Sequence, residues 1–182
     1  MSLLSYNELC GLVELGAIGP VDPKNINGTS IDVHLGEEII IETCVDHNRL
    51  QVIDLEKREP YPHRRFTMLE DGYYLAPGEF ILAHTQEVFN LPNNISCEFK
   101  LKSSSARSGL ENSLATWCDP SWHGSALTLE LKNMLRYTHL LLKPGIPIGQ
   151  MIFFRSTPVP ELKGYAARGR YNNDKSVQEI KA

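Results

Sequence analysis

Two proline-glycine corners, Pro77-Gly78 and Pro144-Gly145, constrain the fold of this chain more than any other feature. Each corner lies between apolar segments of strand-like composition, in residues 73–83 and 140–154. Proline fixes φ and glycine tolerates the left-handed region, so the pair favours a tight turn that joins two strands. Other short apolar runs are also separated by glycine, proline or asparagine turns. This spacing predicts a mainly all-β protein, a sandwich or a barrel, with few helices.

The N-terminal segment is expected to add one short helix. Ser5 and Glu8 form a capping-box pattern, and apolar residues follow at helical spacing to about residue 15. Gly16 is expected to end this helix. Alternating apolar and polar residues predict further strands at 31–35 and 95–101, and an apolar strand is expected at 39–41 after the Gly36 turn. Residues 43–70 are less informative: they hold a candidate strand at 52–55 and a charged, proline-broken segment at 55–66 that suggests an exposed arm or loop.

Composition limits the class of protein and its partners. With 182 residues, of which 42% are hydrophobic, the chain is expected to form a single domain over residues 1–182. The formal net charge of −4 gives no reason to expect a nucleic-acid partner, and no apolar run is long enough to span a membrane. The N-terminus lacks the basic region of a signal peptide, and the 4 cysteines are widely spaced. These features together predict reduced thiols and a cytoplasmic location.

A glutamate on a predicted strand is the first candidate for chemistry. In the segment 127–132 the leucines face one side, and Thr128, Glu130 and Lys132 face the other. If the second face is also covered, the Glu130 carboxylate is desolvated and its pKa is raised, as a general acid/base near neutral pH requires. The alternative is a solvated glutamate paired with Lys132 or with a lysine across the strand.

A serine-rich turn is the second candidate. Lys102, Ser103, Ser104 and Arg107 lie close together in a segment that can form one helical turn ending at Gly109. Free backbone N–H groups, hydroxyls and two cations make a site suited to phosphate. The alternative is an ordinary helix cap with surface charges.

A second turn and the C-terminal tail are weaker candidates. Asp119 could accept a sugar hydroxyl and Trp122 could stack on a base, or both could serve only the turn itself. The tail, residues 165–182, is polar and is expected to be a mobile lid. Its cations, Arg168, Arg170 and Lys175, could fold over a polyphosphate; the alternative is a disordered basic end.

Zinc chemistry has little support in the sequence. The zinc-dependent nucleobase deaminases need a His-x-Glu and a Pro-Cys-x-x-Cys motif, because three ligands must hold the ion that ionises water. Neither motif occurs, and none of the 6 histidines lies at ligand spacing from another histidine or a cysteine. No glycine-rich dinucleotide or P-loop motif occurs either. The sequence therefore predicts no protein-held zinc.

In this order and spacing, the segments resemble the dCTP deaminases, which are grouped with the trimeric dUTPases. The resemblance covers almost the whole chain, and its central block is the specific part. Besides the opening helix, the matching segments are NGTSIDVHLG (27–36), KSSSAR (102–107), CDPSWHG (118–124), TLELKN (128–133), KPGIPIGQ (143–150) and GRYNND (169–174).

The resemblance implies a distorted β-barrel or jelly roll of the dUTPase type, assembled as a homotrimer with active sites between subunits. It implies hydrolytic deamination of dCTP to dUTP and ammonia, with Mg²⁺ bound through the triphosphate and no zinc. The catalytic group implied by the family is Glu130 as general acid/base with Ser103 and Arg107. The implied nucleotide contacts are Lys102, Ser104, Asp119, Thr128, Tyr165, Arg170 and Lys175.

Three hypotheses about function follow. The first is a deaminase that releases dUTP. The second is a bifunctional enzyme that continues to dUMP, or a dUTPase-like pyrophosphatase; Trp117 resembles the aromatic residue of bifunctional enzymes, where many single-activity deaminases have arginine. The third, of another class, is a catalytically silent trimer that binds nucleotides such as dCTP, dUTP or dTTP. In a silent trimer, Glu130 could be replaced without loss of turnover.

Overall fold

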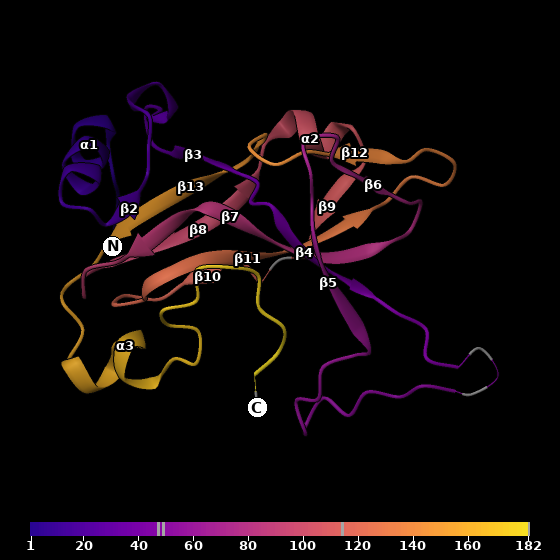
Figure 1. Cartoon of the computed structure of the whole chain (residues 1–182). Helices are drawn as coiled ribbons and strands as arrows, with labels where there is room; N and C mark the ends of the chain where they lie inside the picture. Colours follow the sequence, from indigo (N-terminus) through magenta and orange to yellow (C-terminus); the bar gives the residue numbers. More distant parts are fainter. Residues whose placement is uncertain (47, 49, 114, 182) are drawn as a thin grey trace.

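Two β-sheets enclose the hydrophobic core in this computed structural model, and a two-stranded ribbon lies at one end (Figure 1). The structure describes residues 1–181 except His47, Arg49 and Leu114. The first sheet has the order β1-β13-β8-β10, and β3 also pairs with β13. Its strands are β1 (Ser2–Leu3), β3 (Ile31–His34), β8 (Ile95–Leu101), β10 (Trp117–Cys118) and β13 (Pro147–Arg155).

The second sheet has the order β5-β4-β7-β11-β9, and β2 also pairs with β7. Its strands are β2 (Ile18–Gly19), β4 (Glu38–Glu42), β5 (His63–Thr67), β7 (Phe80–Asn90), β9 (Leu110–Asn112) and β11 (His123–Asn133). The ribbon pairs β6 (Tyr73–Leu75) with β12 (Leu140–Leu142). Both long strands of the second sheet, β7 and β11, are 11 residues long and pair side by side. They form the rigid platform of the molecule.

The proline-glycine corners are confirmed as strand connections. Gly78 (φ +77°) lies between β6 and β7, and Gly145 (φ +81°) lies between β12 and β13. Both glycines adopt the left-handed conformation that side chains disfavour. β6 and β12 pair in antiparallel fashion, with Leu75 opposite Leu140 and Tyr73 opposite Leu142, so the two corners lie at opposite ends of the ribbon.

Helices are few and short, as predicted. They are α1 (Tyr6–Glu14), α2 (Ser103–Arg107), α3 (Tyr165–Arg168) and the 3₁₀ turns η1 (Pro23–Asn25) and η2 (Glu161–Lys163). The capping box of Ser5 and Glu8 is present, and Gly16 lies just after the end of α1 with φ +71°. Among the described residues, no helix has both the length and the apolar character needed to cross a membrane.

The mainly β fold is confirmed, with several corrections to detail. The sheets remain open over the described residues, so no closed barrel forms. Residues 52–55 form no strand; instead β5 forms within the charged segment because it can pair with the edge of β4. Trp122, which the sequence left open as a base-stacking residue, is buried and stacks on Phe89 at 5.2 Å between ring centroids. Its turn folds back against the core, which is a better place for an indole than solvent.

Candidate active site

Strand β11 presents Glu130 to the outside of the core. Leu129 and Leu131 are buried in the hydrophobic core, so Glu130 must point to the opposite face of the sheet. Glu130 lies opposite Leu82 of β7, and the next residue, Leu131, lies opposite Asn112 of β9. Because the strand is paired on both sides, the backbone of Glu130 is held in place and its side chain starts from a fixed point on this face. The predicted alternation of faces is confirmed.

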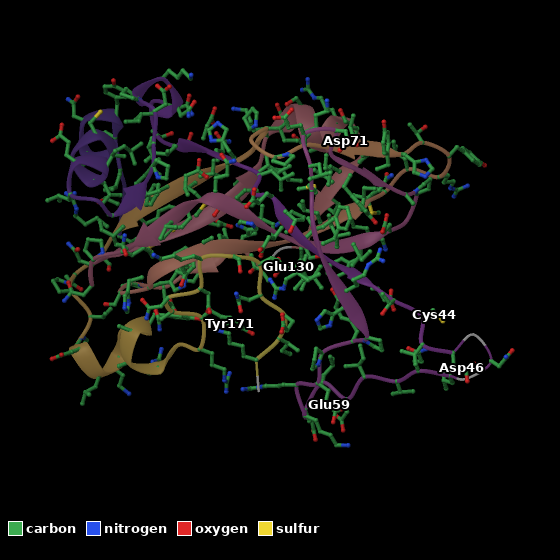
Figure 2. The ribbon with its side chains drawn as sticks, in the orientation of Figure 1. Cys44, Asp46, Glu59, Asp71, Glu130 and Tyr171 are labelled. Carbon is green, nitrogen blue, oxygen red and sulfur yellow. The ribbon has the colours of Figure 1, made fainter. Side chains whose placement is uncertain are left out.

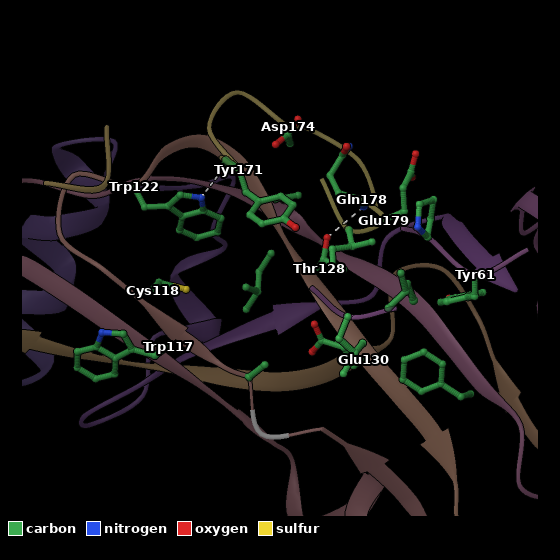
Figure 3. A pocket seen from close by; sticks show the side chains of 18 of the residues that line it. Tyr61, Trp117, Cys118, Trp122, Thr128, Glu130, Tyr171, Asp174, Gln178 and Glu179 are labelled. Carbon is green, nitrogen blue, oxygen red and sulfur yellow. Dashed lines mark hydrogen bonds between the residues drawn. The ribbon is translucent and has the colours of Figure 1, made fainter. Parts of the chain in front are cut away.

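A pocket of about 500 Å³ covers this face of β11 (Figure 3). Its walls come from the arm after β4, from β7, from β10 and the turn that follows it, and from the C-terminal tail. Figure 2 shows Glu130 in the body of the molecule, with Tyr171 on the tail and Glu59 on the arm. Of the predicted site residues, the pocket brings together Glu130, Thr128, Asp119 and Tyr165.

Burial changes the acid-base chemistry of Glu130. Desolvation by the surrounding pocket raises the pKa of its carboxyl group to about 7, and a hydrogen bond from its own backbone N–H acts in the opposite direction. Among the described residues, no lysine, arginine or histidine forms an ion pair with Glu130, so the alternative of pairing with Lys132 is not observed. A carboxyl group with this pKa can both accept and donate a proton near neutral pH.

The pocket is acidic. Carboxylates of Glu59, Asp119, Asp174 and Glu179 line it together with Glu130, and no lysine, arginine or histidine is among its described lining residues. The wall beside Glu130 is apolar, with side chains such as Phe80 and Leu82. Such a surface suits a neutral base and a hydroxyl-bearing sugar, but it repels a triphosphate.

The serine-rich turn lies outside this pocket. Ser103, Ser104 and Arg107 are exposed on α2, which Figure 1 shows at the ribbon end of the molecule, away from the tail. Lys102, just before α2, forms a partly buried ion pair with Asp32. Within one chain, the structure therefore does not bring Ser103, Arg107 and Glu130 together. The predicted site residues form two groups on different parts of the surface.

The C-terminal tail packs over the pocket in its own chain. Val177 is fully buried against Ile40 and Leu82, and the Gln178 N–H donates to Thr128 Oγ1 at 3.1 Å. The tail, which the sequence describes as polar, therefore has one apolar anchor at Val177. The apolar site that Val177 fills is made by strands distant from it in sequence. A single valine among polar residues is only a weak sequence signal for a buried segment.

Further bonds fix the tail at both ends. The Tyr171 carbonyl accepts from the indole of Trp122 at 2.5 Å, and Arg65 donates to the Val177 carbonyl at 2.7 Å. The exposed Arg170 and Lys175 do not line the pocket, so their predicted nucleotide contacts are not formed in this arrangement. Tyr171 and Gln178 line it instead.

Asp119 and Trp117 occupy the opposite wall. Trp117 Nε1–H donates to Asp119 Oδ1 at 3.0 Å, and both residues line the pocket. Over the described part of the chain, no group of three or more His, Cys, Asp or Glu side chains is placed to hold a metal ion. Glu130 is thus the lining carboxylate whose pKa is raised to about 7, and Asp119 is a second carboxylate in the opposite wall.

Fold and site together define an open, mainly β protein with a solvent-shielded carboxylate at the centre of its pocket. Its fold is similar to the crystal structure of 2′-deoxycytidine 5′-triphosphate deaminase from Agrobacterium tumefaciens, with a TM-score of 0.64 and 17% sequence identity. That match covers 84% of this chain and 47% of the Agrobacterium chain, so this chain spans less than half of that protein's length.

Sequence comparisons define the family. Residues 3–156 match the family model described as dCTP deaminase-like. The chain is 35% identical over 145 residues to "dCTP deaminase, dUMP-forming" of Methanospirillum hungatei, covering 78% of this chain and 75% of the relative. It is 37% identical over 146 residues to the protein of the same description from Acidothermus cellulolyticus, covering 79% and 74%. The chain belongs to the dCTP deaminase-like family, which confirms the resemblance found in the sequence.

Proposed function

We propose that the protein deaminates dCTP by hydrolysis, with Glu130 as the general acid/base. The observation that carries this proposal is a desolvated carboxylate, with a pKa of about 7, on a rigid strand inside a pocket. Deamination needs water added at C4 of cytosine, a proton placed on N3, and ammonia expelled. Ionised Glu130 takes one proton from the attacking water and delivers it to N3. It then takes the proton of the new C4 hydroxyl and delivers it to the amino group, which leaves as ammonia while the C4 carbonyl forms.

The product that we propose is dUMP. The relatives from Methanospirillum and Acidothermus are both described as dUMP-forming, and Trp117 resembles the aromatic residue of bifunctional enzymes. This reaction consumes dCTP and two waters and yields dUMP, pyrophosphate and ammonia. Release of dUTP, the first hypothesis from the sequence, is the second candidate and differs only in omitting the phosphoanhydride cleavage. Mg²⁺ enters as part of the substrate, bound to the triphosphate.

A homotrimer with shared sites is the proposed assembly. The separation of α2 from the pocket supports it, because an acidic pocket needs cations that its own lining does not supply. A second copy would bring Lys102, Ser103, Ser104 and Arg107 to the pocket that holds Glu130. The hydroxyls and the guanidinium would then bind phosphate and stabilise the tetrahedral intermediate.

Within that assembly, each chain acts as a single cytoplasmic domain over residues 1–182 with a lid at 165–182. Thr128 and Tyr165 face the nucleotide beside Glu130 and Asp119. In the arrangement described, the Thr128 hydroxyl accepts a hydrogen bond from the Gln178 N–H, and its own O–H remains able to donate to a nucleotide. Arg170 and Lys175 would reach phosphate only after the tail has moved.

Analysis of the products formed from dCTP and Mg²⁺ tests the proposed function. We expect stoichiometric ammonia with dUMP and pyrophosphate, separated by ion-exchange chromatography. If ammonia is released and dUTP is the final product, the protein is a deaminase that does not cleave the phosphoanhydride, and the proposal of dUMP as product is wrong. A protein that binds dCTP but releases no ammonia over hours would contradict both and favour the silent nucleotide-binding trimer. Parallel assays with dUTP as substrate show whether the phosphoanhydride step occurs independently.

Removing residues 165–182 is expected to raise the KM for dCTP about tenfold, because the deletion removes Tyr165 and the basic tail contacts. Steady-state kinetics measure the change. Val177→Asp is the matched variant: it disrupts only the buried anchor and keeps all tail cations, so a smaller rise in KM is expected. An unchanged KM after truncation would contradict the proposal that the tail acts as a lid.

A further inference from the structure

Trp117 holds an unusual place in the pocket wall. It lies on the two-residue strand β10, and its side chain remains 49% exposed although it is one of the largest in the protein. One face of the indole stacks on Phe154 of β13, with centroids 5.8 Å apart and ring planes inclined by 30°. Its N–H points to Asp119, so the ring is held by packing and its donor is directed.

The hydrogen bond restrains the orientation of the Asp119 carboxylate. Asp119 lies two residues after Trp117, where an extended chain places side chains on the same face. Trp117 Nε1 is 3.0 Å from Oδ1, and no other hydrogen bond to this carboxylate comes from the residues that the structure describes. A neutral N–H donor to a carboxylate is a charge-assisted bond. Oδ1 is therefore occupied, while Oδ2 is left to accept from a ligand.

The character of the donor also matters in this pocket. An indole N–H stabilises the Asp119 charge without introducing a cation beside Glu130, so the pKa that desolvation gives Glu130 is not lowered by a nearby positive charge. Stacking on Phe154 restrains the indole, because rotation of the Trp117 side chain away from Asp119 would break this aromatic contact.

We propose that Trp117 is a positioning residue that orients Asp119 to accept the 3′-hydroxyl of the substrate's deoxyribose. This inference rests on the proposed function, in which Asp119 contacts the sugar. In dCTP the 5′-oxygen is esterified and the 2′-position carries no hydroxyl, so the 3′-hydroxyl is the single sugar donor. Trp117 acts through Asp119 and contributes to sugar recognition, whereas Glu130 acts on the base.

The test compares two nucleotides on two proteins. Trp117→Phe keeps an aromatic ring on Phe154 and removes the N–H. With dCTP, we expect KM about tenfold higher and kcat within about twofold of the wild type, since a bond to a charged group is lost while the base site is intact. With 2′,3′-dideoxy-CTP, which lacks the 3′-hydroxyl, both proteins should have the same KM within about twofold. Asp119→Asn should remove the effect of Trp117→Phe.

Two outcomes would overturn the inference. Equal losses on both nucleotides would show that Trp117 only supports the strand, and an unchanged KM for dCTP would show that the hydrogen bond has no role in binding. If the wild type binds dCTP without turnover, the proposed reaction fails, and the same comparison is made by equilibrium titration of the two nucleotides. If the wild type does not bind dCTP at all, the proposed function and the role of Trp117 are both overturned.

Discussion

Glu130→Gln is expected to lower kcat for deamination by at least about a thousandfold while dCTP binding stays within about threefold of the wild type. Glutamine has nearly the same shape and fits the same pocket, but its amide cannot take a proton from water or deliver one to the leaving ammonia. Ammonia release measures kcat, and equilibrium titration measures binding. Glu111→Gln, an exposed change on the neighbouring strand β9, is the matched control and should keep wild-type rates.

The raised pKa of Glu130 adds a pH signature to this prediction. The group must be ionised to act as a base, so the rate of deamination should fall as pH decreases through about 7. Stability should follow the opposite sign. The folded state holds the Glu130 proton up to about pH 7, whereas the unfolded chain releases it near 4.5, so Glu130 lowers the free energy of unfolding as pH rises between these values.

Glu130→Gln should therefore stabilise the protein at pH 8 by about 1–3 kcal/mol, and by little at pH 4. Thermal unfolding at both pH values measures the difference. A variant that is inactive and also less stable at pH 8 would indicate damage to the fold rather than loss of an acid/base group. A variant with wild-type turnover would remove Glu130 from the mechanism and favour the silent trimer.

Arg107→Ala is expected to lower kcat/KM for dCTP by at least about a hundredfold, although Arg107 lies outside the pocket of its own chain. The reason is that the pocket lacks cations among its described lining residues, so in the proposed trimer the guanidinium comes from a second copy. Steady-state kinetics measure the loss. Arg136→Ala, which removes another exposed arginine, is the control and should change kcat/KM by less than about twofold.

Mixing two inactive variants gives a sharper test of the shared site. In trimers reassembled from equal amounts of Arg107→Ala and Glu130→Gln chains, about a quarter of the sites combine an intact Glu130 with an intact Arg107. Activity should therefore return to about a quarter of the wild-type value. If both groups belonged to the same chain's site, every site would keep one defect and the mixture would remain inactive.

Local sequence signals predicted much of the platform. The capping box, the left-handed glycines and the alternation around Glu130 depend on neighbours within a few residues, and each is present in the structure. The raised pKa of Glu130 required one further condition, cover on the second face of the sheet. The sequence could state that condition but could not show that the arm and tail meet it.

Features that depend on distant partners could not be predicted. Strand β5 forms because β4 offers an unpaired edge, and the tail packs because Ile40 and Leu82 leave room for Val177. In both cases a polar segment is ordered by contacts with residues far away in the sequence. A pattern of neighbouring residues cannot reveal such contacts. The proximity of Ser103 and Arg107 to Glu130 was an expectation about the family, and within a single chain the structure separates these residues.

The acidic lining of the pocket has a consequence for how the protein responds to dilution. When the negative wall belongs to one chain and the phosphate-binding cations to the next, a bound nucleotide is held by two chains at once. Thermodynamic linkage then requires that nucleotide strengthen the association of chains, and that dilution weaken nucleotide affinity. In the proposed trimer, bound substrate therefore stabilises the contact between subunits. A chain that has dissociated from the trimer would not turn over dCTP.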